Sequence, residues 1–198
     1  MRVIVVGATG TIGRAVVTAL ERDHHDVLPV SRHSETRVDI SDPESIRAMY
    51  QAVGQVDALI CAAGEARFGP LRQLSDADFQ FSLSNKLMGQ VNLVRFGWDA
   101  IRDGGSFTLT SGVLARSPMP GSGAISLVNA GLEGFVRAAA LEAPRGIRVN
   151  VVSPPWITDT LRAFGMDPAL GIPPDAAASL YVQSLVGDQT GTVIEAAV

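Results

Sequence analysis

The sequence predicts an α/β fold: a doubly wound parallel sheet with helices on both faces, in one domain over residues 1–198. Short runs of β-branched and other apolar residues alternate with longer segments whose apolar residues recur every three or four positions. This alternation is typical of parallel strands joined by helices. A glycine-rich turn connects the first run to the first such segment. With 198 residues, 46% of them apolar and 18% charged, the chain can bury one core.

The expected strands are short runs in which valine, isoleucine and leucine are common. In chain order they are residues 3–6, 27–30, 38–40, 56–61, 106–110, 148–152 and 191–194. Pro29 has no amide proton to give to a neighbouring strand, so the second strand is expected at an edge of the sheet, or with this residue near its end. The last strand is also expected at an edge.

Helices are expected between the strands, each from the spacing of its apolar residues and from its capping signals. Ile12, Val16 and Leu20 lie four residues apart and mark the buried face of the first helix. Ser41 or Asp42 caps the second helix, and a proline fits its first turn.

A capping box at residues 75–78 opens a long helix, which is expected to reach about Ile101 and to end in the glycines of residues 103–105. A helix rich in small residues is expected over 123–142, and a final helix over 175–185. No internal repeat or linker divides the chain, so these elements are expected to share one sheet.

The first strand runs directly into the glycine-rich turn of residues 7–13, Gly-Ala-Thr-Gly-Thr-Ile-Gly, which opens the first helix. Glycines allow the backbone to turn sharply and a diphosphate to come close, and the free amides at a helix N-terminus favour its negative charge. The turn therefore predicts a dinucleotide site of the Rossmann type, with a tight structural turn as the alternative. The contacts expected here are Gly7, Thr9, Gly10, Thr11, Ile12 and Gly13.

The end of the second strand indicates which dinucleotide is bound. An acidic residue there holds the ribose hydroxyl of NAD, whereas a basic residue accepts the additional phosphate of NADP. Arg32 stands at this point and no carboxylate does, so NADP is favoured over NAD. Arg14 would add positive charge. The alternative is that both arginines lie on a solvated face.

Composition excludes several other classes of protein. A net charge of −4 without a basic cluster argues against nucleic acid as a partner. The single cysteine, Cys61, provides neither a disulfide nor a thiolate metal site, and the histidines at 24 and 25 lack partners at ligand spacing, so no metal is expected. We see no apolar run long enough to span a bilayer, so we expect no membrane partner and a cytoplasmic location.

Over nearly its whole length the sequence resembles the short-chain dehydrogenase/reductase family. The matching segments are the turn at 7–13, Asp39, the Cys-Ala-Ala-Gly of 61–64 in place of the family's Asn-Asn-Ala-Gly, residues 110–111, 134–135, 141–142 and 146–154. The resemblance implies a cofactor site that also includes Asp39 at the adenine, Ala62, Ala63 and Gly64 along the cofactor, and Pro154, Ile157 and Thr158 beside the nicotinamide.

In this family a serine, a tyrosine and a lysine carry the chemistry, with the last two spaced Tyr-x-x-x-Lys and an asparagine on the preceding helix. Ser111 matches the serine, but Ile125 stands at the tyrosine position and Asn129 at the lysine position. Lys86 stands at the asparagine position. The sequence thus resembles a branch that lacks the usual pair.

This exchange removes the usual proton donor, because isoleucine has no proton to give. Lys86 would replace it if burial lowered the pKa of its amine; the alternative is a solvent-facing or structural lysine. Ser111 either orients a carbonyl or is a plain hydroxyl at a strand end. Asn129 is either part of a relay or an ordinary polar group of its helix.

Three functions remain open. The first is hydride transfer between NADPH and an unknown small carbonyl or imine substrate. The second is a non-catalytic dinucleotide sensor or partner subunit, and the third is a structural dimer that binds no nucleotide. The resemblance also implies a homodimer or homotetramer through the family's fourth and fifth helices. Small residues on the helix over 123–142 fit such a contact, although they would equally suit packing on the chain's own sheet.

Overall fold

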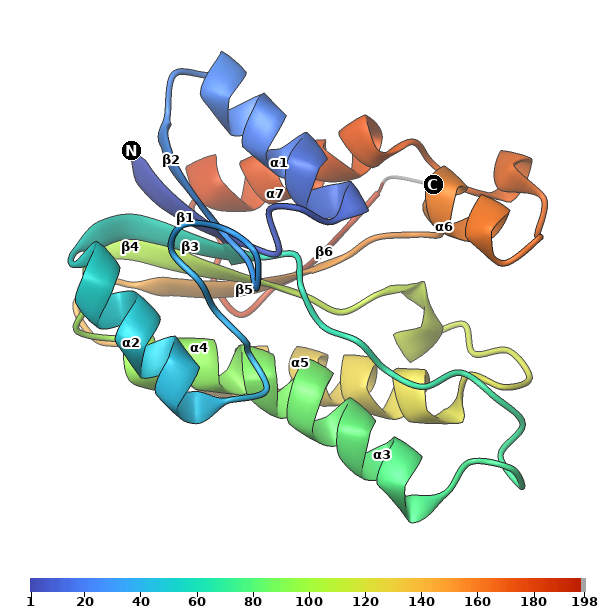
Figure 1. Ribbon diagram of the computed structural model, residues 1–198. Helices are drawn as coiled ribbons and strands as arrows, with labels where there is room; N and C mark the ends of the chain where they lie inside the picture. Colours follow the sequence, from blue (N-terminus) through green and yellow to red (C-terminus); the bar gives the residue numbers. More distant parts are fainter. Residues whose placement is uncertain (197–198) are drawn as a thin grey trace.

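A computed structural model describes residues 1–196 and forms a single parallel sheet between two layers of helices (Figure 1). The strand order is β2-β1-β3-β4-β5-β6, and every neighbouring pair is parallel. The predicted fold class is confirmed. The strands are β1 (Arg2–Val6), β2 (Asp26–Val30), β3 (Val56–Cys61), β4 (Ile101–Thr110), β5 (Arg148–Ser153) and β6 (Val193–Glu195).

Helices cover both faces of the sheet. They are α1 (Thr11–Arg22), α2 (Pro43–Val53), α3 (Asp76–Ser82), the π-helical turn η1 (Leu83–Met88), α4 (Gly89–Gly97), α5 (Gly123–Glu142), α6 (Thr158–Ala163) and α7 (Pro174–Val186), with short 3₁₀ turns η2 (Val113–Ala115) and η3 (Pro168–Leu170). α1 and α7 pack together on one face, and α2, α4 and α5 lie on the other (Figure 1). Each face therefore has its own apolar core.

The local signals of the sequence explain most of these elements. Asp42 caps α2 by accepting a hydrogen bond from the amide of Glu44 at 2.9 Å. Ser75 and Asp78 form the reciprocal capping box that opens α3. Pro29 lies in β2, and β2 is an edge strand, as its missing amide requires.

The predicted strand at 38–40 is wrong. Among the described residues, this stretch of chain forms only one isolated bridge, which joins Arg37, just before the predicted strand, to Ser31, just after β2. The side chains of Val38 and Ile40 are nevertheless buried in the core under α2, and the amide of Asp39 donates to the hydroxyl of Ser45. The apolar pattern here reflects burial of a connecting segment and not the pairing of a strand.

The predicted end of the long helix is also wrong, because α4 ends at Gly97 and β4 already begins at Ile101. Gly97 packs so closely on Tyr50 that a Cβ atom there would lie 2.4 Å from the tyrosine oxygen. Ile101 pairs with Val56, and a register shift follows between β3 and β4. The glycines at 104 and 105 therefore lie within a bulged strand and do not end a helix.

Within residues 1–196, α5 is the one helix long and apolar enough to cross a membrane by length and composition alone. Core helices of globular domains meet the same criterion, and α5 packs on β4 and β5. No group of three His, Cys, Asp or Glu side chains within the same residues is arranged to hold a metal ion.

Candidate functional site

Two adjoining cavities open at the carboxyl ends of the strands. The first, of about 290 Å³, lies where β1, β2 and β3 end. The second, of about 360 Å³, lies beyond the ends of β3, β4 and β5. Gly64 and Glu65 line both cavities, so the two form one continuous cleft. In open α/β sheets ligands bind at this edge, where the strand order reverses, and here the reversal falls between β1 and β3.

The glycine turn brings α1 unusually close to the end of β1. Gly7 has a φ of +83°, and its amide donates to the carbonyl of Val30 at 2.8 Å. A Cβ atom on Gly13 would lie 2.0 Å from the carbonyl oxygen of Gly7, so no other residue fits there. The amide of Gly10 donates back to the same oxygen at 2.9 Å. Of the three glycines of the turn, Gly7 is therefore required by its positive φ and Gly13 by the close approach of α1 to β1.

The N-terminus of α1 presents unpaired amides. Gly10 at the N-cap has no side chain to cap the helix, and no acidic residue lies in the first turn. No residue within 1–196 accepts a hydrogen bond from the amides of Thr11, Ile12 or Gly13. Three free donors at the positive end of a 12-residue helix fit a diphosphate.

Arg32 and Asp39 both line the first cavity. Arg32 pairs with Glu65 at 3.1 Å, and both side chains are more than half exposed. Asp39 accepts hydrogen bonds from the hydroxyl and amide of Ser41. These bonds lower the pKa of Asp39, with a smaller contribution from the positive charge of Arg32, so the carboxyl group is ionised at neutral pH.

The second cavity brings Lys86, Ser111 and Asn129 together with Pro154 and Ile157. Ala62 and Ala63 line the first cavity, and Gly64 lines both. Thr11, Ile12 and Gly13 line neither cavity, and Thr158 lies outside the second. The amide of Thr158 donates instead to the carbonyl of Ile172 at 3.0 Å, where it holds α6 in place.

Lys86 is the only lysine in the chain. Its Nζ donates to the backbone carbonyl of Ser111 at 3.0 Å. Burial lowers the pKa of the Lys86 amine from 10.5 to about 8, because the charged form loses solvation. Gly64, at φ +138°, makes room for the lysine, since a Cβ atom there would lie 2.9 Å from the Cγ of Lys86.

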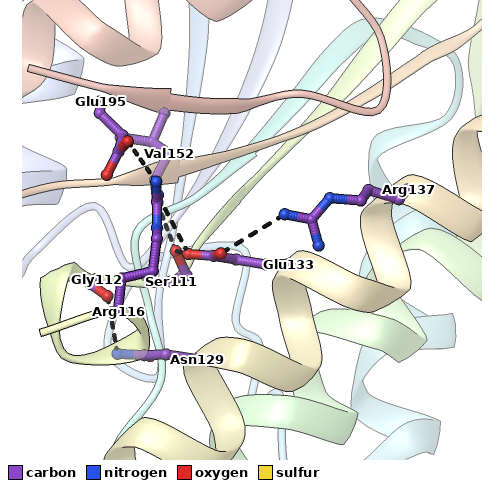
Figure 2. A network of polar contacts seen from close by, with 8 residues as sticks. All are labelled: Ser111, Gly112, Arg116, Asn129, Glu133, Arg137, Val152 and Glu195. Atoms are coloured by element: carbon purple, nitrogen blue, oxygen red, sulfur yellow. Dashed lines mark hydrogen bonds and ion pairs between the residues drawn. The ribbon is translucent and has the colours of Figure 1, made fainter. Parts of the chain in front are cut away.

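The hydroxyl of Ser111 faces a buried carboxylate (Figure 2). It donates to Glu133 at 3.2 Å, and the side chain of Glu133 is only 6% exposed. Arg116 and Arg137 lie 3.5 and 3.8 Å from the same carboxylate, and Arg116 also pairs with Glu195 on β6. The carboxylate of Glu133 is thus the acceptor of the Ser111 hydroxyl and lies between two guanidinium groups.

Asn129 has a buried atom without a partner. Its amide nitrogen lies 3.4 Å from the carbonyl of Gly112, a weak hydrogen bond (Figure 2). Its Oδ1 is fully buried and accepts no hydrogen bond within the described part of the chain. A buried, unsatisfied acceptor that lines a cavity is a position where a ligand O–H or N–H would be stabilised.

Comparison with known proteins gives the family. A family model described as enoyl-(acyl carrier protein) reductase matches residues 6–179. The chain belongs to the short-chain dehydrogenase/reductase family. The crystal structure of the protein lin1944 from Listeria innocua superposes with a TM-score of 0.95 at 37% identity, covering 100% of both chains. A small-chain dehydrogenase in complex with NADPH superposes with a TM-score of 0.87 at 28% identity, covering 99% of this chain and 96% of that one.

Among curated relatives, the acetoacetyl-CoA reductase of Allochromatium vinosum is 26% identical. The alignment is 227 residues long and covers 95% of this chain and 92% of the relative. The predicted membership of the short-chain dehydrogenase/reductase family is therefore confirmed. The alignment that places Ile125 and Asn129 at the family's tyrosine and lysine positions stays a prediction. Both residues lie on α5 and line the second cavity.

Sequence reasoning missed three features of this short-chain dehydrogenase site. Glu133 follows Asn129 by one helical turn, and this spacing on an otherwise small and apolar helix was the available signal. Asn85 accepts a hydrogen bond from the amide of Glu65 at 2.7 Å and lines the first cavity. The third feature is a set of aromatic rings around the second cavity, brought together from segments far apart in the sequence.

Proposed function

We propose that this protein is an NADP(H)-dependent oxidoreductase that transfers hydride between NADPH and a small carbonyl or imine compound. One observation carries the proposal: the cleft that begins at the glycine turn, where Gly7, Thr9 and Gly10 line it, continues into a cavity that holds the amine of Lys86. The NADPH complex of a structural neighbour supports the same choice of dinucleotide.

The chain's own residues would hold the cofactor along this cleft. The amides at 11–13 would bind the diphosphate, and Arg32, exposed and free to leave Glu65, would bind the additional phosphate of NADP. The other proposed contacts are Gly7, Thr9, Gly10, Asp39, Ala62, Ala63, Gly64, Pro154, Ile157 and Thr158. When bound, NADPH supplies the hydride.

Lys86 is the proposed proton donor in place of the missing phenol. An ammonium group has three N–H donors, and the Ser111 carbonyl takes one of them, which leaves two for a substrate oxygen. A pKa of about 8 keeps Lys86 protonated at neutral pH while leaving the proton easy to release. In the reducing direction the carbonyl carbon gains the hydride and the oxygen takes the Lys86 proton. The neutral amine then recovers a proton from water.

Ser111 would act differently from a carbonyl-orienting donor. Glu133 accepts its hydroxyl proton, so the Ser111 oxygen presents lone pairs and not a proton to any group beside it. This leaves Lys86 as the donor. Asn129 would offer its unpartnered Oδ1 to an O–H or N–H of the bound ligands.

The second candidate function is a dinucleotide sensor or partner subunit without catalysis. The observation that favours it is Ile125, an apolar side chain that lines the second cavity and that the predicted alignment puts at the family's tyrosine position. A thermal-shift assay with NADPH, NADP, NADH and NAD tests the binding that both functions share. A ligand at 100 times its dissociation constant stabilises the fold by about 2.7 kcal/mol. No shift with any of the four nucleotides would reject both.

Turnover separates the two functions. Purified protein is offered NADPH and a panel of aldehydes, ketones and imines, and the assay is repeated with Lys86→Ala and Ser111→Ala. Activity that is lost in Lys86→Ala supports the oxidoreductase with the roles proposed here. Activity that ignores both substitutions contradicts those roles, and NADPH binding without turnover on any compound favours the sensor.

We also propose a homodimer, or a tetramer built from it, through α4 and α5. In the single chain α5 leaves an apolar stripe uncovered, with Leu127 49% and Leu141 90% exposed, and a Cβ atom on Gly134 would meet no atom within 4 Å. Light scattering on the wild type and on Leu127→Glu tests this: the variant is expected to be a monomer. No nucleic acid or membrane partner is proposed, and the cytoplasmic location stays a prediction.

A further inference from the structure

The proposed function leaves the substrate open, and the second cavity restricts its chemistry. We infer that this cavity takes a compact, uncharged aromatic ketone or aldehyde and not a thioester of coenzyme A or of an acyl carrier protein. This inference rests on the proposed function, since it concerns the carbonyl compound that Lys86 would protonate. Its evidence is the ring lining, the pairing of charges and the size of the cavity.

Four aromatic rings line the cavity: Phe68, Phe81, Trp156 and Phe164. Phe68 and Phe164 stack with their centroids 6.3 Å apart and their planes at 26°. Trp156 meets Phe164 edge-on at 6.5 Å. Rings arranged in this way offer both faces and edges to another ring.

Two of these rings remain largely uncovered. Phe68 is 45% exposed and Phe164 is 59% exposed, although the two rings stack on each other and Phe164 also packs against Trp156. Phe68 follows β3, whereas Phe164 follows α6, so two separate segments place their rings on one cavity. Exposed rings around a hollow mark a binding surface that an apolar ligand would cover.

The charges around the cavity do not suit an acidic thioester carrier. Coenzyme A carries several phosphates, which proteins bind with unpaired arginine and lysine. Two cations line the cavity, and the first is Arg67. Its Nε lies 3.7 Å from the Oδ1 of Asp78, and its Cζ lies 3.9 Å from the centroid of the Phe81 ring. The other is Lys86, which donates to the Ser111 carbonyl inside the cavity. Arg67 is thus the one arginine among the lining residues, and the carboxylate of Glu65 adds an opposing charge.

The size of the cavity also favours a compact molecule. Its volume of about 360 Å³ lies at the small end of the range for ligand pockets, and the proposed nicotinamide would occupy part of it. The unpartnered Oδ1 of Asn129 indicates that the space is a binding site and not a packing defect. A flat ring with one carbonyl group would place its oxygen at Lys86 and its ring among the phenylalanines.

Equilibrium dialysis tests the inference without requiring turnover. The probes are 2-acetylnaphthalene, an uncharged aromatic ketone, and acetoacetyl-CoA, each measured with and without saturating NADP. We expect the ketone to bind more tightly than the thioester. Phe164→Ala and Phe68→Ala are each expected to weaken ketone binding about tenfold. Val186→Ala, an equally exposed apolar position on α7 across the sheet, is the matched control and is expected to leave it unchanged.

Three results would overturn the inference: tighter binding of acetoacetyl-CoA, ketone binding that ignores both phenylalanine substitutions, or no ketone binding at all. Phe164→Leu, which keeps an apolar side chain without a ring, distinguishes loss of the ring from loss of bulk. The proposed function is tested separately by titrating each variant with NADPH. NADPH binding without ketone binding would reject the substrate class alone, and failure to bind NADPH would reject the proposed function itself.

Discussion

The two cavities present different parts of the chain to their ligands. The first lies at the ends of β1, β2 and β3, and the glycine turn lines it just before the free amides of residues 11–13 on α1. The second is lined by side chains from η1, α5 and the segments around α6. A backbone site keeps its amide donors under substitution as long as the glycines of its turn remain, whereas a side-chain site changes its chemistry with each substitution. This difference is consistent with the predicted alignment, in which the nucleotide turn is kept while Ile125 and Asn129 stand at the family's tyrosine and lysine positions.

The largest effect is expected from the side-chain site. Lys86→Gln should lower turnover by about 10²–10⁴-fold, because a general acid contributes this much, and should change NADPH affinity far less, because Arg32 and the glycine turn lie at the first cavity. The pH profile of the wild type should fall above about pH 8 as the Lys86 amine loses its proton, and the variant should lack this fall. Steady-state kinetics over pH 6–10 measures both. A fall near pH 8 that persists in the variant would assign that titration to another group.

The backbone site should respond to one added methyl group. Gly13→Ala places a carbon 2.0 Å from the Gly7 carbonyl oxygen, so α1 must move away from β1. We expect a loss of about 3 kcal/mol in the free energy of unfolding, together with loss of measurable NADPH binding. Gly69→Ala is the matched control, because its new methyl group would make only an ordinary van der Waals contact, at 3.4 Å from Leu74. Denaturant melts and NADPH titration of the two variants should differ sharply, and equal behaviour would contradict the proposed turn.

The stability of the fold should depend on the lysine of the second cavity. Folding lowers the pKa of Lys86 from 10.5 to about 8, so between these values the unfolded chain binds more protons than the folded one. Stability should therefore rise with pH through this window, by about 2–3 kcal/mol in the wild type relative to Lys86→Met. Urea melts at about pH 7.5 and pH 10.5 give the difference between the two proteins.

Because the chain has a single lysine, ¹³C-labelled lysine gives one side-chain signal, and its titration reads the same pKa directly. A titration near the ordinary lysine value would show that the cavity leaves the amine solvated and would remove the basis for its role as acid.

The smallest effect on binding is expected at Arg32, whose side chain lines the first cavity. Arg32→Ala should weaken NADPH about tenfold and NADH hardly at all, since a hydrogen bond to a charged group contributes about 1.5–3 kcal/mol and the pair with Glu65 is exposed. Glu65→Gln, which frees Arg32, should keep or improve NADPH affinity. Fluorescence titration of both nucleotides measures the ratio, and equal losses for NADPH and NADH would place Arg32 away from the additional phosphate.

The positions of helices and strands could be predicted from the sequence where short-range signals determine them. They were predicted less well where contacts between distant segments determine them. Asp42, the capping box at 75–78 and Pro29 each act within a few residues, so their positions in helix caps and at a sheet edge could be predicted. Val38 and Ile40 are apolar because they are buried, and burial alone does not distinguish a connecting segment from a strand. The end of α4 depends on contact between Gly97 and Tyr50, which lie far apart in the chain.

The candidate site divides in the same way. The glycine turn is contiguous in sequence, and the structure places it at the cleft. The direction of the Ser111 hydroxyl depends on Glu133, and Glu133 is held by Arg116, which also pairs with Glu195 on the last strand (Figure 2). No spacing rule connects these residues, because two of them follow β4 and η2 and the other two lie on α5 and β6.

The wide turn η1 links the two cavities through consecutive residues. Asn85 holds the amide of Glu65 beside the nucleotide end, and Lys86 reaches the Ser111 carbonyl in the other cavity. The positions at which the substrate specificity could be changed therefore differ in their effect on nucleotide binding. A library that randomises 83–88 would alter affinity for nucleotide and substrate together, whereas one confined to the aromatic rings would redesign the substrate end while sparing the nucleotide end.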